Sequence, residues 1–506
     1  MAVTLTRARD AAAREDWAGA YALLHEADRH PTAPLAPGDL DALADSAWWS
    51  GRIEESVTAR LRAHAAHVAA GDLRGAGVTA WWLAFEYRRL GRPAAAAGWL
   101  RRARHHLEGR AAGAERCLLA LADAEEAEQH HDPAAALAAA RRMTRLAERS
   151  GSPGLVALGR HAEASVLLAQ GRRAEGLALL DDAMRAVTAG ELGSLDTGRM
   201  FALAVGRCLG AADLRRAVEW TDAAMAWCSV PRTQRVAPAP GAPPGTPAAP
   251  VADNPFRGPC RLHHVEVLDL LGAWRRAEEE AHLVHQEVLE DALDAAAAAS
   301  YAAGDIQRRQ GRSAEAARSY ARAHALGRVP QPGLALLRLA EGRADTALAG
   351  LRLALDCQSD PLHDLLGRAR LLAALTDVTL ALGATGAAEQ AVLALEGLAS
   401  APEAPLLAAF AGTARGALAL ARGEPAHPPL RRALALWTEL RVPYEAARTR
   451  MLLAAAHRAA GDEAAARLAL TTARAAFERL GATPDARRAA TLLTRPPVPP
   501  PDGTTP

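Results

Sequence analysis

A short phrase that recurs along the chain constrains its fold more than any other feature of the sequence. Each copy runs from an apolar segment through a small residue and a charged or polar pair into an alanine-rich segment, as in "RRQGRSAEAA" and "RAAGDEAAA". The small residue is glycine in the clearest copies, at Gly51, Gly91, Gly171, Gly272, Gly311, Gly342, Gly383 and Gly461. Weaker copies centre on Glu15, His131, Ala212 and Gly423. Most of these positions lie about 40 residues apart, which indicates an internal repeat of helix pairs.

The residues between these turns favour helices. Alanine, leucine, arginine and glutamate dominate, aromatic residues make up 4%, and no run of β-branched residues predicts a strand. A single helix pair cannot bury its apolar face alone, so neighbouring pairs must stack. We therefore expect an all-α fold in which about twelve antiparallel helix pairs stack into a right-handed superhelix.

The residues within one copy resemble the tetratricopeptide repeat. Around Gly311, the small, glycine, alanine, aromatic and alanine positions of that repeat fall on Gly304, Gly311, Ala316, Tyr320 and Ala323. Small residues let two antiparallel helices approach closely, and the turn glycine supplies a positive φ at the helix end. In two other copies, Trp17 and Trp274 occupy the aromatic position just after the turn. The period near 40 is closer to that of HEAT repeats, but the residue pattern favours the tetratricopeptide type.

The spacing changes between Ala212 and Gly272, which are 60 residues apart. This interval contains the proline-rich segment Val230 to Pro255, which can neither continue a helix nor build a core. We expect a flexible loop there; an inert insertion is favoured, and a hinge or docking segment stays open. The sequence thus predicts N-terminal helical repeats over 1–229, the insert over 230–255, C-terminal helical repeats over 256–494 and a proline-rich linker or tail over 495–506.

Charge and missing motifs exclude several classes of function. The chain has 59 basic residues, all arginine, and 58 acidic residues, so it lacks the positive field that drives nonspecific binding to nucleic acids or membranes. Without lysine it has neither a GxxxxGK phosphate loop nor a Schiff-base lysine, and GxSxG and HExxH are absent. We expect a protein that is not an enzyme and binds no cofactor. The N-terminus lacks a signal peptide and no long apolar stretch follows, which predicts a cytoplasmic protein without a membrane span.

Cysteine and histidine offer the remaining metal-ligand chemistry. The five cysteines form no CxxC pair and are interpreted as small core residues in a reducing cytosol: Cys117, Cys208, Cys228, Cys260 and Cys357. Two histidine pairs at i, i+3 share a helix face and could present two ligands to one ion. No third ligand lies at helical spacing beside either pair, so we favour solvated or helix-end histidines and expect no metal site. This applies to His64 with His67, to His282 with His285, and to the doublets His105/His106, His130/His131 and His263/His264.

Tryptophan doublets are the best candidates for a binding surface. The stretches "SAWWSGR" and "TAWWLAFEYRRLG" contain Trp48, Trp49, Trp81, Trp82, Phe85 and Tyr87. Adjacent residues on an α-helix point about 100° apart, so both indoles of a doublet are not expected to enter the same core. Two interpretations stay open. Burial of both rings between neighbouring helices is favoured, and contact of one ring with a ligand or peptide in the inner groove is the alternative.

Longer phrases that generic repeat packing does not explain occur along nearly the whole chain. They are "DWAGAYALLHEAD", "LADSAWWSGRIEESVTAR", "FRGPCRLHHVEVLDLLGAWRRAEEEA", "RAHALGRVPQPGLALLRLAEGRAD" and the segment from "VPYEAARTR" to "ERLGATPD". The prolines and tyrosine of "PQPGLALLRLAEG" and "PYEAARTR" are the most specific. These phrases resemble the LuxR-type transcriptional regulators of actinobacteria, which carry a long tetratricopeptide-like region ahead of a C-terminal helix-turn-helix.

This resemblance implies that the chain is the signal-sensing, partner-binding repeat region of a helix-turn-helix regulator. In that family a proline linker leads into a DNA-binding domain that opens with a phrase like G-L-T-x-R-E, whereas this sequence has Gly503, Thr504, Thr505 and Pro506. We therefore expect no DNA-binding residue in this chain and no direct DNA binding by it alone. The expected ligand is a protein or peptide partner, or a small effector, in the repeat groove, and a homodimer stays open. A free-standing tetratricopeptide adaptor that mediates protein–protein interaction is the alternative.

Overall fold

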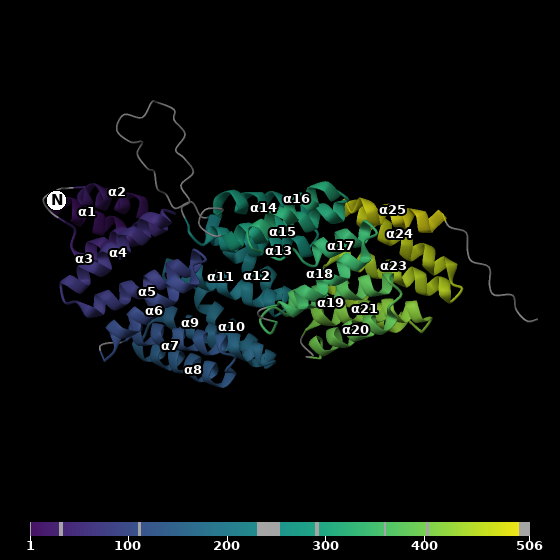
Figure 1. Ribbon diagram of the computed structural model, residues 1–506, viewed down its shortest axis with the longest axis horizontal. Helices are drawn as coiled ribbons and strands as arrows, with labels where there is room; N and C mark the ends of the chain where they lie inside the picture. Colours follow the sequence, from purple (N-terminus) through teal and green to yellow (C-terminus); the bar gives the residue numbers. More distant parts are fainter. Residues whose placement is uncertain are drawn as a thin grey trace, which may run out of the picture.

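The protein is an array of α-helices (Figure 1). The computed structural model describes residues 2–29, 34–109, 113–229, 254–288, 293–358, 361–400 and 404–494, with the backbone alone for Ala2 and 285–288. These residues form 25 helices and no strand. Residues 230–253 of the proline-rich insert and the tail 495–506 lie outside the described residues. Within the described part of the chain, no helix is both long enough and apolar enough to cross a membrane.

The helices follow one another in antiparallel pairs. The first six pairs are α1 (Ala2–Ala13) with α2 (Trp17–Asp28), α3 (Pro37–Trp49) with α4 (Ile53–Ala69), α5 (Leu73–Arg89) with α6 (Pro93–Leu107), α7 (Ala114–Gln129) with α8 (Pro133–Ser150), α9 (Pro153–Ala169) with α10 (Arg173–Thr188), and α11 (Ser194–Gly210) with α12 (Leu214–Ser229).

Six further pairs follow the insert, and α25 (Thr483–Thr494) covers the last of them. They are α13 (Arg257–Leu270) with α14 (Trp274–Val288), α15 (Leu293–Gln310) with α16 (Ser313–Ala325), α17 (Gly333–Ala340) with α18 (Ala344–Asp356), α19 (Leu365–Ala381) with α20 (Thr385–Leu398), α21 (Pro405–Arg422) with α22 (His427–Glu439), and α23 (Pro443–Ala459) with α24 (Glu463–Leu480). The expected all-α array of tetratricopeptide-like helix pairs is confirmed.

All twelve predicted turn residues adopt the left-handed backbone conformation. The nine glycines have φ between 66° and 84°, and Glu15, His131 and Ala212 have φ of 58°, 56° and 57°. The turn bonds are the same in both groups: the Arg92 amide donates to the Tyr87 carbonyl at 2.9 Å, and the Asp132 amide donates to the Ala127 carbonyl at 2.9 Å. The geometry of the turn therefore fixes the repeat, and glycine is its least strained occupant.

Small residues allow the helices of a pair to approach each other closely. A Cβ atom on Gly304 of α15 would lie 2.9 Å from the Tyr320 ring of α16, so this position has room only for glycine. Ala316, Tyr320 and Ala323 are buried on the facing helix. The tetratricopeptide positions predicted in this copy thus form the contact between the two helices.

The stack bends far enough for distant repeats to touch. Helix α11 contacts α19, and α15 contacts α25, which lies beside α15 and α16 in Figure 1. Between the seventh and twelfth pairs, Trp274, Tyr444 and Phe477 share one buried cluster. The Arg309 guanidinium lies over the Trp274 and Tyr444 rings. It also donates to Asp269 at 2.8 Å and pairs with Asp305, so an ion-pair network borders this aromatic core. This closure joins segments about 170 residues apart.

Four of the five cysteines are buried, as expected for core residues. Cys357 is exposed, so the prediction is wrong for that residue. It follows α18 directly, at the end of a helix rather than on its packed face.

One buried histidine makes the array sensitive to acid. His161 of α9 is 7% exposed, and burial, together with Arg207, lowers its pKa from the usual 6.5 to about 3. The folded state therefore keeps the ring neutral, whereas the unfolded chain binds a proton below pH 6.5. The contribution of His161 to the free energy of unfolding should be fully present above pH 6.5 and be lost as the pH falls from 6.5 towards 3, by about 5 kcal/mol.

We expect the His161→Gln variant to lose less stability than the wild type over this pH range. Thermal unfolding followed by circular dichroism at several pH values measures the difference. The control is His282→Gln, because the His282 side chain is 55% exposed. Parallel pH profiles for wild type and His161→Gln would contradict the assignment.

Closure of the array can be tested at one turn glycine. Gly272 has φ of 77°, and a Cβ there would lie 2.6 Å from Leu480 and 2.7 Å from Pro443. Gly91 has φ of 66° but nothing within 4 Å of its added Cβ. Both Gly→Ala variants incur the left-handed strain of about 1 kcal/mol, and Gly272→Ala should lose roughly 1 to 3 kcal/mol more by overpacking. Urea unfolding of the two variants measures this; equal losses would contradict the contact.

Candidate functional site

Seven aromatic rings contact one another in a continuous chain near the N-terminal end of the array. We call them the aromatic cluster: Trp17, Trp48, Trp49, Trp81, Trp82, Phe85 and Phe256. Five of the six predicted binding residues belong to it. The sixth, Tyr87, is half-buried on α5 and lies outside this chain of contacting rings.

Both indoles of the first doublet enter the same core. Trp48 is 3% exposed and Trp49 is 5% exposed. Trp49 stacks on Trp17 of α2 with 5.5 Å between ring centroids, whereas Trp48 faces Phe85 of α5 at 6.3 Å. The Phe256 ring lies 5.5 Å from Trp48 and 6.1 Å from Trp49. The expectation that two adjacent indoles cannot share a core is wrong here, because α3 is covered from two sides and Phe256 fills the space between.

The second doublet is divided between core and surface. Trp81 is buried, whereas Trp82 and Phe85 are half-buried. Phe85 stacks against Trp81 at 6.1 Å and meets Trp82 edge-on at 5.5 Å. The half-buried rings of the cluster are thus Trp17 on α2 and Trp82 and Phe85 on α5, and these can touch another molecule, whereas Trp48, Trp49 and Trp81 are buried behind them.

A buried ion pair holds Trp82 in place. The Arg60 Nε donates to Glu86 Oε1 at 2.6 Å, and the guanidinium lies 4.9 Å from the Trp82 ring centroid. Burial disfavours the charged guanidinium, but Asp45 and Glu86 outweigh it and raise the pKa of Arg60. Burial also raises the pKa of Glu86, against the opposing effect of Arg60. Burial thus disfavours both charges, and each charge is stabilised by its partner.

A second arginine lies against buried Trp81 and half-buried Phe85. The Arg199 guanidinium of α11 lies 5.6 Å from the Trp81 centroid and 5.5 Å from that of Phe85. Burial lowers its pKa, although Glu125 and Asp196 favour the charge. Arg89 approaches Phe85 at 6.0 Å and donates to the Pro255 carbonyl at 3.3 Å. Aromatic faces next to partly desolvated guanidinium groups suit aromatic or anionic groups of a ligand.

The histidines divide between exposed and buried positions. His67 is a helix-end histidine in the last turn of α4, but it is buried, and its two ring nitrogens contact Asp72 and Asp41 at 2.8 Å each. His264 is also buried, and His64 meets His106 across two helices at 3.3 Å. His105, His130, His131 and His282 are exposed, and the His285 side chain lies outside the described residues. No group of three or more metal-ligating side chains occurs in the part of the chain that the structure describes.

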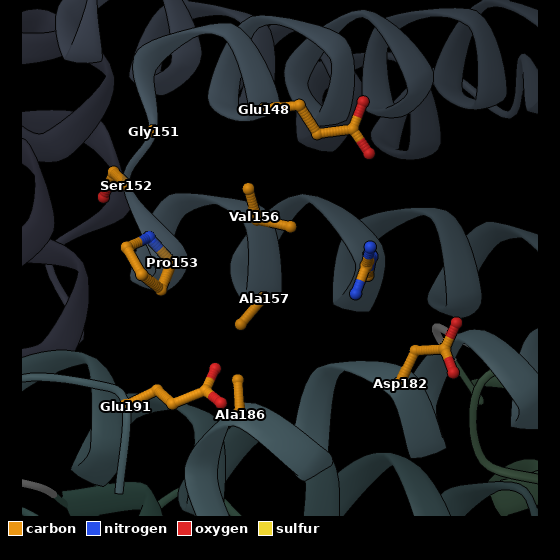
Figure 2. Close-up of a pocket in the computed structure, with 10 residues that line it drawn as sticks. Glu148, Gly151, Ser152, Pro153, Val156, Ala157, Asp182, Ala186 and Glu191 are labelled. Atoms are coloured by element: carbon orange, nitrogen blue, oxygen red, sulfur yellow. The ribbon is translucent and has the colours of Figure 1, made fainter. Parts of the chain in front are cut away.

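A hollow of about 330 Å³ lies between α8, α9 and α10, apart from the aromatic cluster (Figure 2). Its lining combines apolar residues of α9 with the carboxylates of Glu148, Asp182 and Glu191 and one guanidinium, that of Arg160. In Figure 2 the carboxylates of Glu148 and Asp182 flank α9 from opposite sides. The charge of this hollow favours cations, but Asp182 is already paired with Arg185.

Sequence reasoning missed Phe256 and Arg199 as members of the site. Phe256 follows the proline-rich insert and returns to α3, about 200 residues earlier in the chain. Gly198 in the second turn of α11 carries a local signal, because a Cβ there would collide with the Phe256 ring. A glycine inside a helical pattern indicates close approach of another group, but it does not identify that group.

No family model matches the chain, and no curated protein sequence matches it significantly. A chain in the crystal structure of the APC/C hetero-tetramer Cut9–Hcn1 is 13% identical, with a TM-score of 0.44, over 97% of this chain and 96% of that chain. The human IFIT1 dimer with m7Gppp-AAAA contains a chain 14% identical, with a TM-score of 0.39, over 95% of each. The structure of Naa15/Naa10 bound to HypK-THB contains one 12% identical, with a TM-score of 0.27, over 97% of this chain and 91% of that chain.

The support of Trp82 by the buried ion pair predicts an unequal effect of two arginine substitutions on α4. Arg60→Met leaves Glu86 buried without its cation and should cost roughly 3 to 5 kcal/mol of stability. Arg62 pairs with Asp28 at the surface, so Arg62→Met should cost about 1 kcal/mol or less. Thermal unfolding measures both, and tryptophan fluorescence reports whether the cluster is disturbed. The double variant Arg60→Met/Glu86→Leu should recover much of the loss; no recovery would contradict the unpaired-charge explanation.

Proposed function

We propose that the array is the partner-binding, regulatory region of a LuxR-type transcriptional regulator and binds a protein or peptide through the exposed side of the aromatic cluster. The observation that carries the partner-binding part is the half-buried pair Trp82 and Phe85, bordered by Arg89 and Arg199. Aromatic and arginine side chains supply most of the binding energy at protein interfaces. A rigid array of helix pairs presents such groups without a large loss of conformational entropy on binding.

The proposal of a transcriptional regulator rests on the sequence phrases that resemble LuxR-type proteins. In this proposal another domain binds DNA. The net charge of this chain agrees with that, because its 59 basic residues are balanced by 58 acidic ones. In this proposal Trp48, Trp49 and Trp81 support the surface, and Trp82, Phe85 and Tyr87 contact the partner. A small effector at the same surface is the second form of the proposal.

Matched tryptophan substitutions test the surface. Trp82→Ala and Phe85→Ala should weaken capture of the partner in pulldowns from native cells by about tenfold or more, as expected for interface hot spots. Trp99→Ala is the control for local packing, because half-buried Trp99 on α6 packs against the same Ala80, Trp81 and Ala103 core as Trp82 and Phe85, whereas its ring contacts His64 and not the aromatic cluster. Circular dichroism confirms that each variant is folded. Equal capture by all variants would refute the proposed surface.

A DNA-binding assay tests the proposal that another domain binds DNA. The chain alone should give no sequence-specific mobility shift with duplex DNA at physiological salt, since it has no excess of positive charge. Specific binding by this chain would overturn the assignment of DNA reading to another domain. A helix-turn-helix encoded beyond Pro506 would support the regulator over a free-standing adaptor.

A further inference from the structure

Arg199 of α11 is a half-buried arginine without a carboxylate partner. Among the residues that the structure describes, its guanidinium forms no ion pair and no hydrogen bond. Arg448 of α23 is also half-buried, but it donates to Asp377 at 2.6 Å and to Glu445 at 3.1 Å. These carboxylates raise the pKa of Arg448, whereas burial lowers the pKa of Arg199. The Arg199 charge is therefore partly removed from water without a compensating anion.

The two carboxylates near Arg199 are engaged elsewhere. Glu125 and Asp196 favour its charge from a distance, but neither forms an ion pair with it. Glu125 pairs with Arg88 of α5. Asp196 lies against the first turn of α9, where a Cβ atom on Gly154 would collide with its carboxylate. The N–H donors of the Arg199 guanidinium thus remain available for an anion.

Aromatic rings of the candidate site hold the Arg199 guanidinium. It lies 5.5 Å from the Phe85 centroid and 5.6 Å from the Trp81 centroid. These two rings stack on each other at 6.1 Å with 9° between their planes. Phe85 and Arg199 are both half-buried, so a ring and a guanidinium can be reached together from solvent. Contact with the rings pre-organises the guanidinium, and less side-chain entropy is lost when it binds an anion.

We propose that Arg199 binds a carboxylate of an acidic peptide segment in the partner, next to an apolar or aromatic side chain that packs on Phe85 and Trp82. This inference rests on the proposed partner-binding function and names the kind of segment that fits the surface. A planar guanidinium donates two parallel hydrogen bonds to a carboxylate. Arg89, whose guanidinium lies 6.0 Å from the Phe85 centroid, adds positive charge at the same ring.

Glu125 and Asp196 also narrow the class of anion. Their negative charges act on Arg199 and would repel a strongly charged polyanion, and the net charge of the chain is only +1. A nucleic acid carries a charge at every phosphate. A peptide can instead place one carboxylate at Arg199 and an uncharged side chain on Phe85. A peptide with spaced acidic residues therefore fits this surface better than a nucleic acid does.

Binding of two labelled peptides to the full-length chain tests the preference for an acidic segment. The acidic peptide consists of repeated glutamate, phenylalanine and glycine units, and the control peptide has glutamine in place of each glutamate. Fluorescence anisotropy at low salt should give a dissociation constant about tenfold lower for the acidic peptide, because hydrogen bonds between charged groups are the stronger ones. The difference should shrink as the salt concentration rises.

Substitutions assign this preference to one arginine. Arg199→Met should remove the tenfold difference, and Arg199→Lys should restore part of it, because an ammonium keeps the charge but lacks the planar pair of donors. The matched control is Arg102→Met, since Arg102 also lies over a tryptophan, 4.6 Å from the Trp99 centroid, but outside the aromatic cluster. An unchanged preference in Arg199→Met, or an equal loss in Arg102→Met, would overturn the proposal. Tighter binding of an oligothymidylate of equal charge than of the acidic peptide would overturn it as well.

Urea unfolding separates anion binding from a structural role of Arg199. Arg199→Met removes a charge that has no anion partner, and methionine can still pack against the rings, so the unfolding midpoint should equal or exceed that of the wild type. Arg448→Met leaves Asp377 and Glu445 without their cation and should lower the midpoint. A midpoint of Arg199→Met as low as that of Arg448→Met would contradict the proposal, because it would indicate a structural ion pair.

Partner pulldown distinguishes this inference from the function on which it rests. If Trp82→Ala, Phe85→Ala and Arg199→Met each weaken capture by about tenfold, both are supported. If only the two aromatic substitutions weaken capture, the partner surface stands and its preference for an acidic segment is overturned. If none of the three weakens capture while the acidic peptide still requires Arg199, the anion site stands and the proposed partner-binding function fails.

Discussion

The close crossing of two helices at a left-handed turn is the constraint on which the rest of the structure depends. Twelve turns share this backbone conformation, whether the residue is glycine, glutamate, histidine or alanine. Each turn sets the angle between the two helices of one pair. Stacking of successive pairs adds a small rotation at each step, until α11 reaches α19 and α15 reaches α25. The position of the aromatic cluster follows from that accumulated geometry.

Local properties of the chain were predictable and distant contacts were not. The period, the turn positions and the small residues at Gly304 and Ala316 follow from helix-pair packing and can be read from one copy. The burial of both Trp48 and Trp49 depends on Phe256, about 200 residues away, and the burial of His67 depends on Asp41 from another helix. Pairings over such distances are set by superhelical curvature, which no single repeat encodes.

Arginine performs two tasks in this lysine-free protein. At the N-terminal end Arg60 joins a carboxylate to the Trp82 face, and at the closure Arg309 joins Asp269 and Asp305 to the Trp274 and Tyr444 faces. The planar guanidinium can pair and stack at once, which an ammonium group does less well. A buried charge that loses its partner carries a large desolvation penalty, so these groups favour one register of helix packing over others.

Closure of the array changes how it responds to stress. In an open solenoid each repeat touches only its neighbours, so unfolding can start at an end and travel inwards one pair at a time. Here the terminal helix α25 is anchored on α15, and the seventh pair shares a core with the twelfth. Release of the C-terminal end therefore exposes a core several repeats away. A force applied to the C-terminal end must therefore first separate α25 from α15 and the twelfth pair from the seventh, before single repeats of this half can extend.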